Sequence, residues 1–344
     1  MVSRNIVPIF VPHLGCPHDC AFCNQRKIAN QDSPHNPHEI MKEIEKRLNW
    51  FKKEREVQIA FYGGSFTAIP TKKMDIYLQI GQKFIQEGRV DSLRISTRPD
   101  CIDEDILVKL KKYNVKTVEL GLQSMDDEVL SANHRGHNSM ATVNAVKKIK
   151  KHGFELGLQM MIGLYNESIK SVFFTANKIV DFNPNFVRIY PTLVLEETYL
   201  EKLYQKKCYI PLTLEETIDL LKKMALLFKR NNIPIIRIGL QPTEEINKDK
   251  VIAGPFHPSL RFLVEEAIYE DRVFPFLEKH RPFKTIEVKA PQSELNYLIG
   301  LKGRIKKKII KLYQPEKIKY YSVENNQIQI VLDKKIYDLE EEQL

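Results

Sequence analysis

The chain has 344 residues, enough for one large α/β domain and a smaller second one. Hydrophobic residues make up 43% of it, but no apolar run approaches the ~20 residues of a membrane span. The N-terminal residues lack a signal-peptide pattern, and five cysteines are an odd number for a disulfide framework. We therefore exclude a membrane-spanning or disulfide-stapled secreted protein and expect a cytoplasmic one. The net charge of +9 is informative only through its distribution.

Three of the cysteines lie close together near the N-terminus in the spacing C-x3-C-x2-C, namely Cys16, Cys20 and Cys23. Closely spaced thiolates can hold an iron–sulfur cluster, and a cubane cluster normally takes four cysteines. One iron would therefore be left open for a substrate or a cofactor. The alternative is a structural zinc site with His13 or His18 as the fourth ligand. Zinc motifs favour two C-x2-C pairs, and no second pair exists in this sequence, so we favour a 4Fe–4S cluster.

This spacing, with the aromatic Phe22 before the last cysteine, resembles the radical S-adenosylmethionine (SAM) superfamily. The resemblance implies that SAM chelates the open iron through its amino and carboxylate groups. It also implies that the reduced cluster cleaves SAM to a 5′-deoxyadenosyl radical. The cofactors would supply the difficult chemistry, and the protein would position them and exclude side reactions. In the superfamily the residue equivalent to Phe22 packs near the adenine, which makes Phe22 a candidate SAM-binding residue.

Between residue 6 and about residue 240, short β-rich apolar runs alternate with longer helical patterns, as in βα units around a parallel sheet. The predicted strands are residues 7–11, 57–62, 92–97, 117–120, 155–162 and 186–190. The predicted helices are residues 38–53, 72–87, 104–113, 139–152 and 167–181. Six such units predict an α/β fold of the partial TIM type, a (β/α)6 barrel.

Candidate SAM-binding residues follow these strands, where the reactive groups of α/β barrels gather. Gly63 and Gly64 let backbone groups approach a ligand because neither has a Cβ atom. They resemble the family's GGE-type segment, whose backbone holds the methionyl amino group of SAM. Arg98 and Gln123 are candidates for the SAM ribose or carboxylate, although polar residues at such positions also cap helices. Met161 lies at the end of the fifth strand, and its main chain would complete the SAM site.

Two further residues at strand ends, Cys101 and Tyr190, are candidate catalytic residues. The thiol of Cys101 could donate a hydrogen atom to a product radical or act as an acceptor. An isolated cysteine is, however, commonly a small buried hydrophobe. Tyr190 could face the substrate together with Arg188 and Tyr62. An ion pair for Arg188 and core packing for Tyr62 are equally consistent with the sequence.

The predicted radical SAM core occupies residues 1–245 and is followed by a linker and helical segment at 246–283, with the helix running to about residue 269. Residues 284–344 predict a small basic α+β domain with a strand at 285–289, helices at 294–299 and 304–313, and strands at 318–322 and 327–332. A GxxG sequence lies between these two helices. Between Lys302 and Lys319 there are eight positive residues and one negative residue, which indicates a polyanionic partner.

This order of elements resembles a KH domain, whose GxxG loop clamps four nucleotides of RNA by close backbone approach. Its candidate RNA-binding residues are Gly300, Lys302, Gly303, Arg304, Lys306 and Lys307. The alternative is an ordinary αα-hairpin with a solvated lysine-rich helix.

The motifs FYGGSFTA, STRPD, VELGLQS, NHRGH, MMIGL and FVRIYPTLV, in this order, resemble the radical SAM domain of the elongator catalytic subunit and its bacterial relatives. The resemblance covers about residues 4–245 and implies a transfer RNA (tRNA) substrate. The chain departs from that family in its shorter cysteine spacing. After residue 245 too few residues remain for the roughly 150-residue fold that an acetyltransferase domain needs. Acetyl transfer is therefore not expected.

We expect a radical SAM enzyme, a transferase or an oxidoreductase, that modifies a nucleotide of tRNA or another RNA. Its cofactors would be the 4Fe–4S cluster and SAM, and its electron donor a protein such as flavodoxin or ferredoxin. One alternative is a radical SAM oxidoreductase for a small metabolite, because coproporphyrinogen-oxidase-like enzymes share the cysteine spacing. The other is a non-catalytic iron–sulfur RNA-binding protein.

Overall fold

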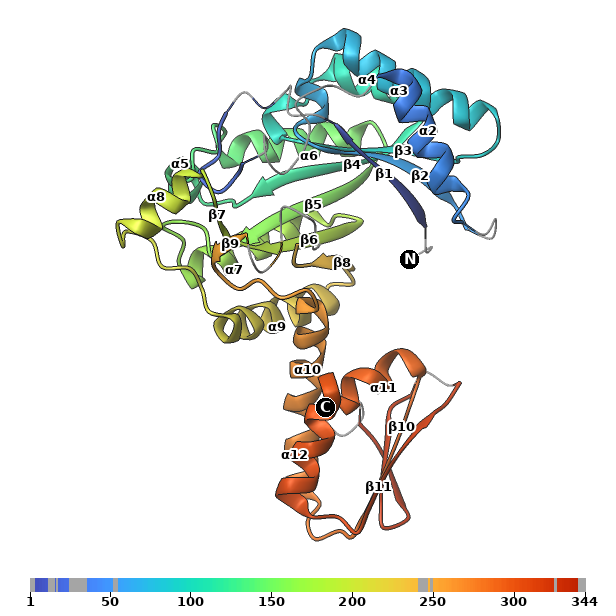
Figure 1. The fold of residues 1–344 in the computed structure, drawn as a ribbon, viewed down its shortest axis with the longest axis vertical. Helices are drawn as coiled ribbons and strands as arrows, with labels where there is room; N and C mark the ends of the chain where they lie inside the picture. The colour runs from blue at the N-terminus through green and yellow to red at the C-terminus, as the bar shows by residue number, and fades with distance from the viewer. Residues whose placement is uncertain are drawn as a thin grey trace. The chain divides into compact units, whose positions relative to one another are not determined.

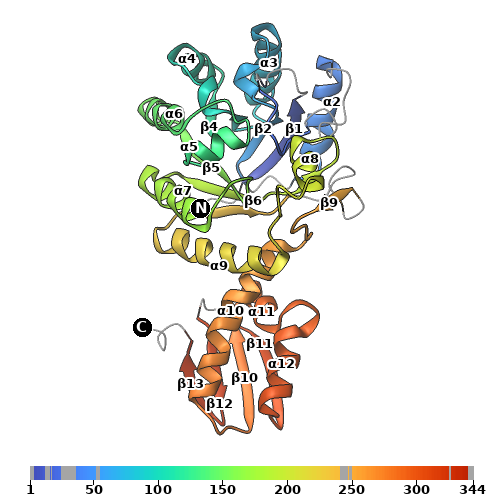
Figure 2. The ribbon, with the colours of Figure 1, turned by 90° about the vertical axis from the view of Figure 1, so that its left-hand side faces the viewer.

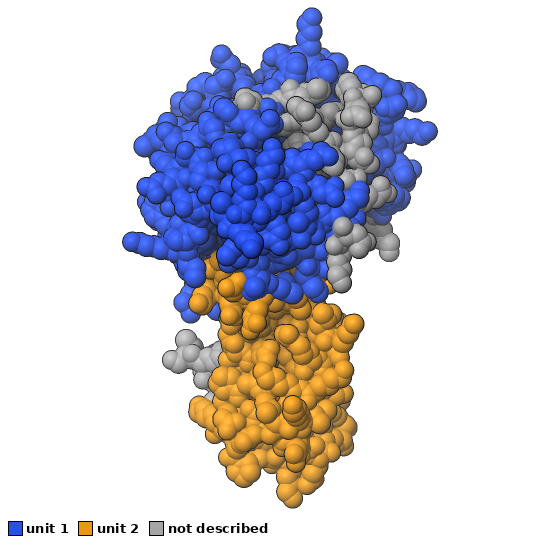
Figure 3. All heavy atoms as spheres, turned by 60° about the vertical axis from the view of Figure 1, so that its left-hand side comes forward, with its two compact units in different colours: residues 1–214, 224–258 blue, residues 215–223, 259–344 orange. Residues whose placement is uncertain are grey.

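The computed structural model describes residues 4–11, 16, 18–24, 36–51, 55–240, 247, 250–324 and 327–339. The chain divides into two compact units, shown in blue and orange in Figure 3. Unit 1 contains residues 1–214 and 224–258, and unit 2 contains residues 215–223 and 259–344. The two units are defined by which residues lie close together, and they do not test the functional boundaries expected at residues 245 and 283. Those boundaries stay a prediction. Within the described ranges, no helix combines the length and apolar character needed to cross a membrane.

Unit 1 is built on a parallel sheet in which strands that follow one another in the chain lie side by side (Figures 1 and 2). The strand order is β1-β2-β3-β4-β5-β6-β8. The strands are β1 (Asn5–Val11), β2 (Val57–Gly63), β3 (Ser92–Thr97), β4 (Val115–Gln123), β5 (Glu155–Ile162), β6 (Phe186–Pro191) and β8 (Ile235–Ile238). A small antiparallel pair joins β7 (Val194–Leu195) to β9 (Val251–Ala253).

Helices cover the outer side of the curled sheet, as Figure 2 shows for α2, α3, α4, α6 and α7. The helices are α2 (Pro37–Leu48), α3 (Thr71–Gln86), α4 (Glu104–Lys112), α5 (Asp127–Ala132), α6 (Ser139–Lys151), α7 (Ile169–Phe182), α8 (Tyr199–Gln205) and α9 (Leu214–Arg230). Several begin at a side-chain cap: Asp103, Asn138 and Ser168 each accept a hydrogen bond from a first-turn amide. Such caps satisfy backbone donors that a helix leaves without partners.

Alternation along the strands separates an apolar outer face from a polar inner face. On β2, Ile59 and Phe61 are fully buried, and Phe61 stacks on Phe66 with 5.1 Å between ring centroids. The intervening Gln58 and Tyr62 instead contact polar side chains of β3 and β4. Because successive strand residues point to opposite sides, the outer residues build the core and the inner ones line the barrel.

The structure confirms the predicted partial TIM-type fold. In unit 1 the sequence analysis did not identify β8 or the short strands β7 and β9. Strand β8 has four residues between Pro234 and Gly239 and pairs in parallel with β6. A run so short has no readable periodicity, so only its neighbour in the sheet identifies it. The strands at 92–97 and 155–162 have the predicted bounds.

Unit 2 has a four-stranded sheet in the order β11-β10-β12-β13. Its elements are α10 (Leu260–Lys279), β10 (Thr285–Ala290), α11 (Gln292–Ile299), α12 (Arg304–Tyr313), β11 (Lys317–Ser322), β12 (Gln329–Leu332) and β13 (Lys335–Asp338). Strand β10 runs parallel to β11 and antiparallel to β12. Ile286 and Val288 on β10 pack with Ile305 and Ile309 on α12 in one core. The predicted order of strand, helix, GxxG, basic helix and strands is therefore present.

Two features of unit 2 differ from the expectation. The helix α10 continues ten residues beyond residue 269, so the part of the 246–283 segment that was expected to follow the helix as a linker is helical as far as Lys279. Pro275 lies inside this helix without ending it. The hairpin strand β13 was not predicted, because residues 335–338 are largely exposed and offer little apolar pattern.

Candidate functional site

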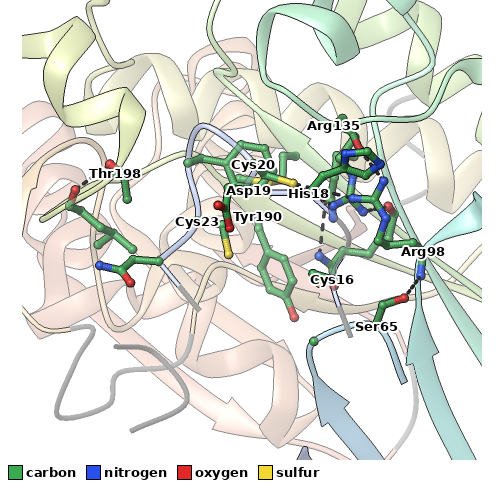
Figure 4. A pocket seen from close by; sticks show the side chains of 18 of the residues that line it. Cys16, His18, Asp19, Cys20, Cys23, Ser65, Arg98, Arg135, Tyr190 and Thr198 are labelled. Atoms are coloured by element: carbon green, nitrogen blue, oxygen red, sulfur yellow. Dashed lines mark hydrogen bonds between the residues drawn. The ribbon is translucent and has the colours of Figure 1, made fainter. Parts of the chain in front are cut away.

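A pocket of about 480 Å³ lies at the carboxyl ends of the barrel strands (Figure 4). The three cysteines of the C-x3-C-x2-C motif line it together with every residue predicted to bind SAM and with Tyr190. The predicted residues are Cys16, Cys20, Phe22, Cys23, Gly63, Gly64, Arg98, Gln123, Met161 and Tyr190. Segments far apart in sequence thus contribute to one cavity, although their individual roles stay predictions.

Backbone hydrogen bonds hold the cysteine loop in place over this pocket. The amide of Ala21 donates to the carbonyl of Asn133 at 3.0 Å, and the amide of Leu200 donates to the carbonyl of Ala21 at 2.8 Å. The side chain of Asn133, 1% exposed, also bonds to both backbone groups of Tyr165 in the loop after β5. One buried asparagine therefore connects the cysteine loop to the far side of the site.

Two buried guanidinium groups stand behind Cys20. The Nη1 atom of Arg135 lies 3.2 Å from Cys20 Sγ, and that of Arg98 lies 3.9 Å from it. Arg98 is 2% exposed and donates to Asp100 through two nitrogens at 2.9 Å and to the carbonyl of Arg135 at 2.5 Å. Burial disfavours the Asp100 carboxylate, yet the bonds from Arg98 outweigh it and lower the pKa of Asp100. These donors are committed to the protein, so Arg98 supports the cysteine loop from behind.

Special backbone geometry shapes the other wall. Gly63 has φ +114°, and a Cβ there would lie 2.5 Å from the carbonyl oxygen of Val11 on β1. The close approach is thus between two strands and requires glycine. Gln123 ends β4 with φ +64°, at a point where the register with β5 shifts. A non-glycine residue in this region stores strain, which is common at ligand sites.

The residues at the pocket fit an anionic cluster. Arg98 pairs with the Asp100 carboxylate, whereas Arg135 has no ion pair among the residues described, so it brings an unpaired positive charge to Cys20. The Nε atom of Arg135 is also buried without a hydrogen-bond partner. A cluster on three thiolates is anionic and would balance this charge. In the described part of the chain, no three His, Cys, Asp or Glu side chains converge on a single ion. Of the two alternative zinc ligands, His13 lies outside the described residues and His18 lines the pocket.

Several lining residues were not assigned a role from the sequence. They are Ser65, Ser96, Gly121, Arg135, Gln159 and Thr198. Gln159 could have been found, because it lies two residues before Met161 and therefore on the same face of β5. Arg135 stands in the NHRGH motif, but its contact with Cys20 could not have been found, because that contact spans 115 residues of chain.

Cys101 does not line the pocket but lies behind its wall. A hydroxyl cluster fills this region: Ser65 Oγ is 2.7 Å from Thr97 Oγ1, which is 2.6 Å from Thr67 Oγ1. Thr67 Oγ1 donates to the carbonyl of Cys101 at 2.6 Å. Burial raises the pKa of the Cys101 thiol, so it is protonated at neutral pH. The thiol could reach a radical in the pocket only through the segment around Ser65.

The GxxG loop of unit 2 has left-handed backbone at Gly300, Lys302 and Gly303. Gly300 is packed tightly, since a Cβ there would lie 2.6 Å from Glu266 Oε1 and 2.7 Å from the amide nitrogen of Ile305. Gly303 has no atom within 4 Å of an added Cβ. The loop is therefore fixed on one side by α10 and α12 and open at its second glycine.

Only some of the basic residues of unit 2 remain available for a polyanion. Arg304 Nε pairs with Glu266 Oε1 at 2.9 Å, and Lys308 pairs with Glu270, so α10 neutralises one side of α12. Lys302, Lys306 and Lys307 have no ion pair among the residues described, and Lys306 lies over the ring of Tyr320. The structure thus distinguishes Arg304 from the other predicted RNA-binding residues.

A curled parallel sheet with a three-cysteine loop at the carboxyl ends of its strands defines the class of partial (β/α) barrels that hold an iron–sulfur cluster. Residues 10–179 match the radical SAM superfamily, and residues 184–270 match the radical SAM C-terminal domain. The chain belongs to the radical SAM superfamily, whose members use a 4Fe–4S cluster and SAM.

The chain is similar to the tRNA uridine(34) acetyltransferase of Methanocaldococcus infernus, with 34% identity over 48% of this chain and 35% of that protein. It is also similar to the heme chaperone HemW of Buchnera aphidicola, with 26% identity over 57% of this chain and 52% of that protein. The chain thus spans between a third and half of the length of these relatives. The solved structure of M. infernus Elp3 with an N-terminal deletion shares the fold, with a TM-score of 0.60 and 22% identity over 81% of this chain and 64% of that chain.

Glu167 makes the stability of the barrel depend on pH. Its carboxylate accepts the amide of Leu164 at 3.1 Å, its other oxygen is buried without a partner, and burial raises its pKa to about 8. Because the folded state holds this proton more tightly than the unfolded state, Glu167 contributes fully to the free energy of unfolding below the ordinary pKa of 4.5. That contribution is lost as the pH rises to about 8. Glu167→Gln should flatten this part of the profile of urea midpoint against pH. The exposed Glu128→Gln should keep the wild-type slope, and equal slopes in all three proteins would contradict the assignment.

The two loop glycines should differ in their tolerance of alanine. Gly300→Ala combines left-handed strain with overlap on Glu266 and Ile305, and we expect a loss of about 3 kcal/mol. Gly303→Ala meets no neighbour and should lose only ~1 to 2 kcal/mol, the cost of left-handed backbone. Hydrogen–deuterium exchange of peptides from α11 and α12 measures the difference, and comparable protection in both variants would show that the packing around Gly300 is not limiting.

Proposed function

We propose that this chain is an enzyme that cleaves SAM reductively and uses the radical to modify a nucleotide of tRNA or another RNA. The observation that carries the chemistry is the single pocket that brings the cysteine loop together with Gly63, Gly64, Gln123 and Met161. When bound, the 4Fe–4S cluster and SAM would supply a 5′-deoxyadenosyl radical. Cys16, Cys20 and Cys23 would hold the cluster, and an electron donor such as flavodoxin or ferredoxin would reduce it.

The protein's own residues would orient SAM and keep the radical from water. Phe22 packs with the apolar cluster of Met161 and Leu164, which offers a flat surface for an adenine. Tyr190 packs against the same cluster and lines the pocket, so its ring would stand beside the reacting atoms. Such apolar walls exclude side reactions of a reactive intermediate.

The choice of RNA as substrate is supported by unit 2 and by one relative. The GxxG loop provides an open glycine, and Lys302, Lys306 and Lys307 have no ion pair within the described residues, which suits a sugar–phosphate backbone. The M. infernus relative named above is a tRNA uridine(34) acetyltransferase, although this chain matches only 35% of it. The proposal concerns radical chemistry on RNA and does not extend to acetyl transfer.

A second candidate is radical chemistry on a small metabolite, or cofactor handling without catalysis. The similarity to a heme chaperone favours it, as does the apolar part of the pocket formed by Leu193, Leu195 and Leu240. This candidate needs no RNA contact with unit 2.

The experiment that tests the function combines two measurements. Total tRNA from cells with and without the gene is digested and compared by mass spectrometry, and the anaerobically reconstituted, reduced protein is assayed for 5′-deoxyadenosine from SAM. We expect one nucleoside to be missing without the gene, and Cys20→Ala to abolish 5′-deoxyadenosine formation. Unchanged tRNA with intact SAM cleavage would favour the small-metabolite candidate. Absence of SAM cleavage by the wild type would refute the proposal that the chain is a SAM-cleaving enzyme.

Cys101 gives a second prediction. If its thiol donates or accepts a hydrogen atom, Cys101→Ala should stop product formation and leave SAM cleavage intact. Cys101→Ser keeps the size of the side chain and should behave like Cys101→Ala, because a hydroxyl is a poor hydrogen-atom donor. Unchanged turnover by both variants would assign Cys101 to packing behind Ser65.

RNA binding should weaken with salt in a way that identifies the lysines. Each phosphate contact adds about −0.7 to the slope of log affinity against log salt for a single strand, so the double change Lys302→Gln and Lys307→Gln should make it shallower by roughly 1.4. The exposed Lys147→Gln on α6 serves as the control and should leave the slope unchanged. A slope that is equal in all proteins would place the RNA elsewhere.

A further inference from the structure

The inner face of the barrel, below the pocket, carries a buried cluster of Glu119, Arg94, Arg188 and Tyr62. Arg188 Nε lies 2.7 Å from Glu119 Oε2, and Arg94 Nη1 lies 3.0 Å from Glu119 Oε1. Tyr62 donates its hydroxyl proton to Glu119 at 3.1 Å and accepts a hydrogen bond from Arg188 Nη2 at 2.9 Å. One carboxylate is thus shared by two guanidinium groups and a phenol.

The charges of this cluster do not balance. Glu119 neutralises one arginine, and burial raises the pKa of Tyr62 so that it stays uncharged. Beneath the cluster, Arg4 and Lys116 pair with Glu56 and Glu155, and these four charges cancel. The cluster of Glu119, Arg94, Arg188 and Tyr62 therefore carries one net positive charge. A buried charge without a counter-ion is costly, so a ligand that supplies the missing negative charge would bind favourably.

The surplus charge is accessible at Arg188. The side chain of Arg188 is 15% exposed, compared with 5% for Arg94. Among the described residues its Nη1 atom has no hydrogen-bond partner, while Nε and Nη2 are held by Glu119 and Tyr62. Nη1 is not a fully buried atom, because it would then be both buried and unpaired, which it is not, so it keeps accessible surface. The guanidinium is therefore fixed in position with one donor left open.

Arg188 is not among the residues that line the pocket, but its neighbours on the same face of the sheet are. Arg188 is the register partner of Gln159 on β5, and Gln159 lines the pocket. Tyr190, two residues further along β6, lines it as well and lies on the same face of the strand. A guanidinium recognises carboxylate and phosphate oxygens through parallel N–H donors, and a pre-oriented one loses little entropy on binding them.

We propose that Arg188, with Gln159 beside it, seats an oxyanion, a carboxylate or a phosphate, of the substrate that enters this pocket. This inference adds a binding role to the proposed function. It rests on that function in one respect, namely that the substrate enters this pocket. The oxyanion could belong to the RNA backbone next to the target nucleotide or to a free small co-substrate. In both cases the recognised chemistry is the same.

Inorganic phosphate serves as the probe in the anaerobically reconstituted protein saturated with SAM, at constant ionic strength. Phosphate should raise the thermal midpoint of the wild type by several degrees more than that of Arg188→Gln, and Arg188→Lys should keep part of the effect. Lys307→Gln controls for phosphate bound to unit 2 and should keep the Arg188-dependent part. Equal midpoint shifts in the wild type and Arg188→Gln would overturn the proposal.

A second measurement needs no variant. Phenylglyoxal modifies accessible arginines, and peptide mass spectrometry gives the rate at Arg188 in the wild-type protein. Phosphate should slow this rate several-fold, and an unchanged rate would overturn the proposal. If phosphate protects Arg188, protection by saturating tRNA in a separate, phosphate-free sample would assign the oxyanion to RNA, and no protection by tRNA would assign it to a free compound. Neither measurement requires turnover, so protection at Arg188 together with unmodified tRNA would refute the proposed function and leave this site standing.

Discussion

The guanidinium of Arg98 is the interaction on which the rest of the site depends. It is almost fully buried and bonds to Asp100 and to the carbonyl of Arg135, and it lies beside Cys20, while its backbone amide donates to Ser65. Four segments that are distant in sequence meet at this one residue. Because a buried charge needs all its partners, any shift of one segment would leave an ion unpaired, and the segments are therefore held in one arrangement.

The same principle operates at two further places, with different consequences. At Cys20 the unpaired charge of Arg135 suits an anionic cluster on thiolates, whereas at Arg188 the surplus charge suits an oxyanion of the substrate. In unit 2 the opposite holds, because Glu266 and Glu270 neutralise Arg304 and Lys308 and leave the lysines near the GxxG loop for a polyanion. The distribution of paired and unpaired charges thus separates residues that hold the fold from residues available to ligands.

Much of this could be predicted from the sequence, because it depends on local pattern. The cysteine spacing, the two glycines at the end of β2 and the strands at 92–97 and 155–162 are short-range features that can be read from neighbouring residues. The carboxyl ends of parallel strands meet at one edge, which is why Gln123 and Met161 could be placed in the pocket before any coordinates. The strand β8 escaped prediction because four residues are too few for a pattern.

The sequence by itself determined the chemistry that the chain can carry: three cysteines, a barrel of βα units and a basic GxxG segment. Only the tertiary structure decided which side chains are free to act. Arg98 and Arg304 stay candidate ligand-binding residues, and the structure adds that each donates a hydrogen bond to a carboxylate, Asp100 and Glu266 respectively. Arg188 was expected either to face substrate or to form an ion pair, and it does the second while one nitrogen stays open. The physical reason is that ion pairing and burial depend on contacts between residues far apart in the chain, which no local pattern records.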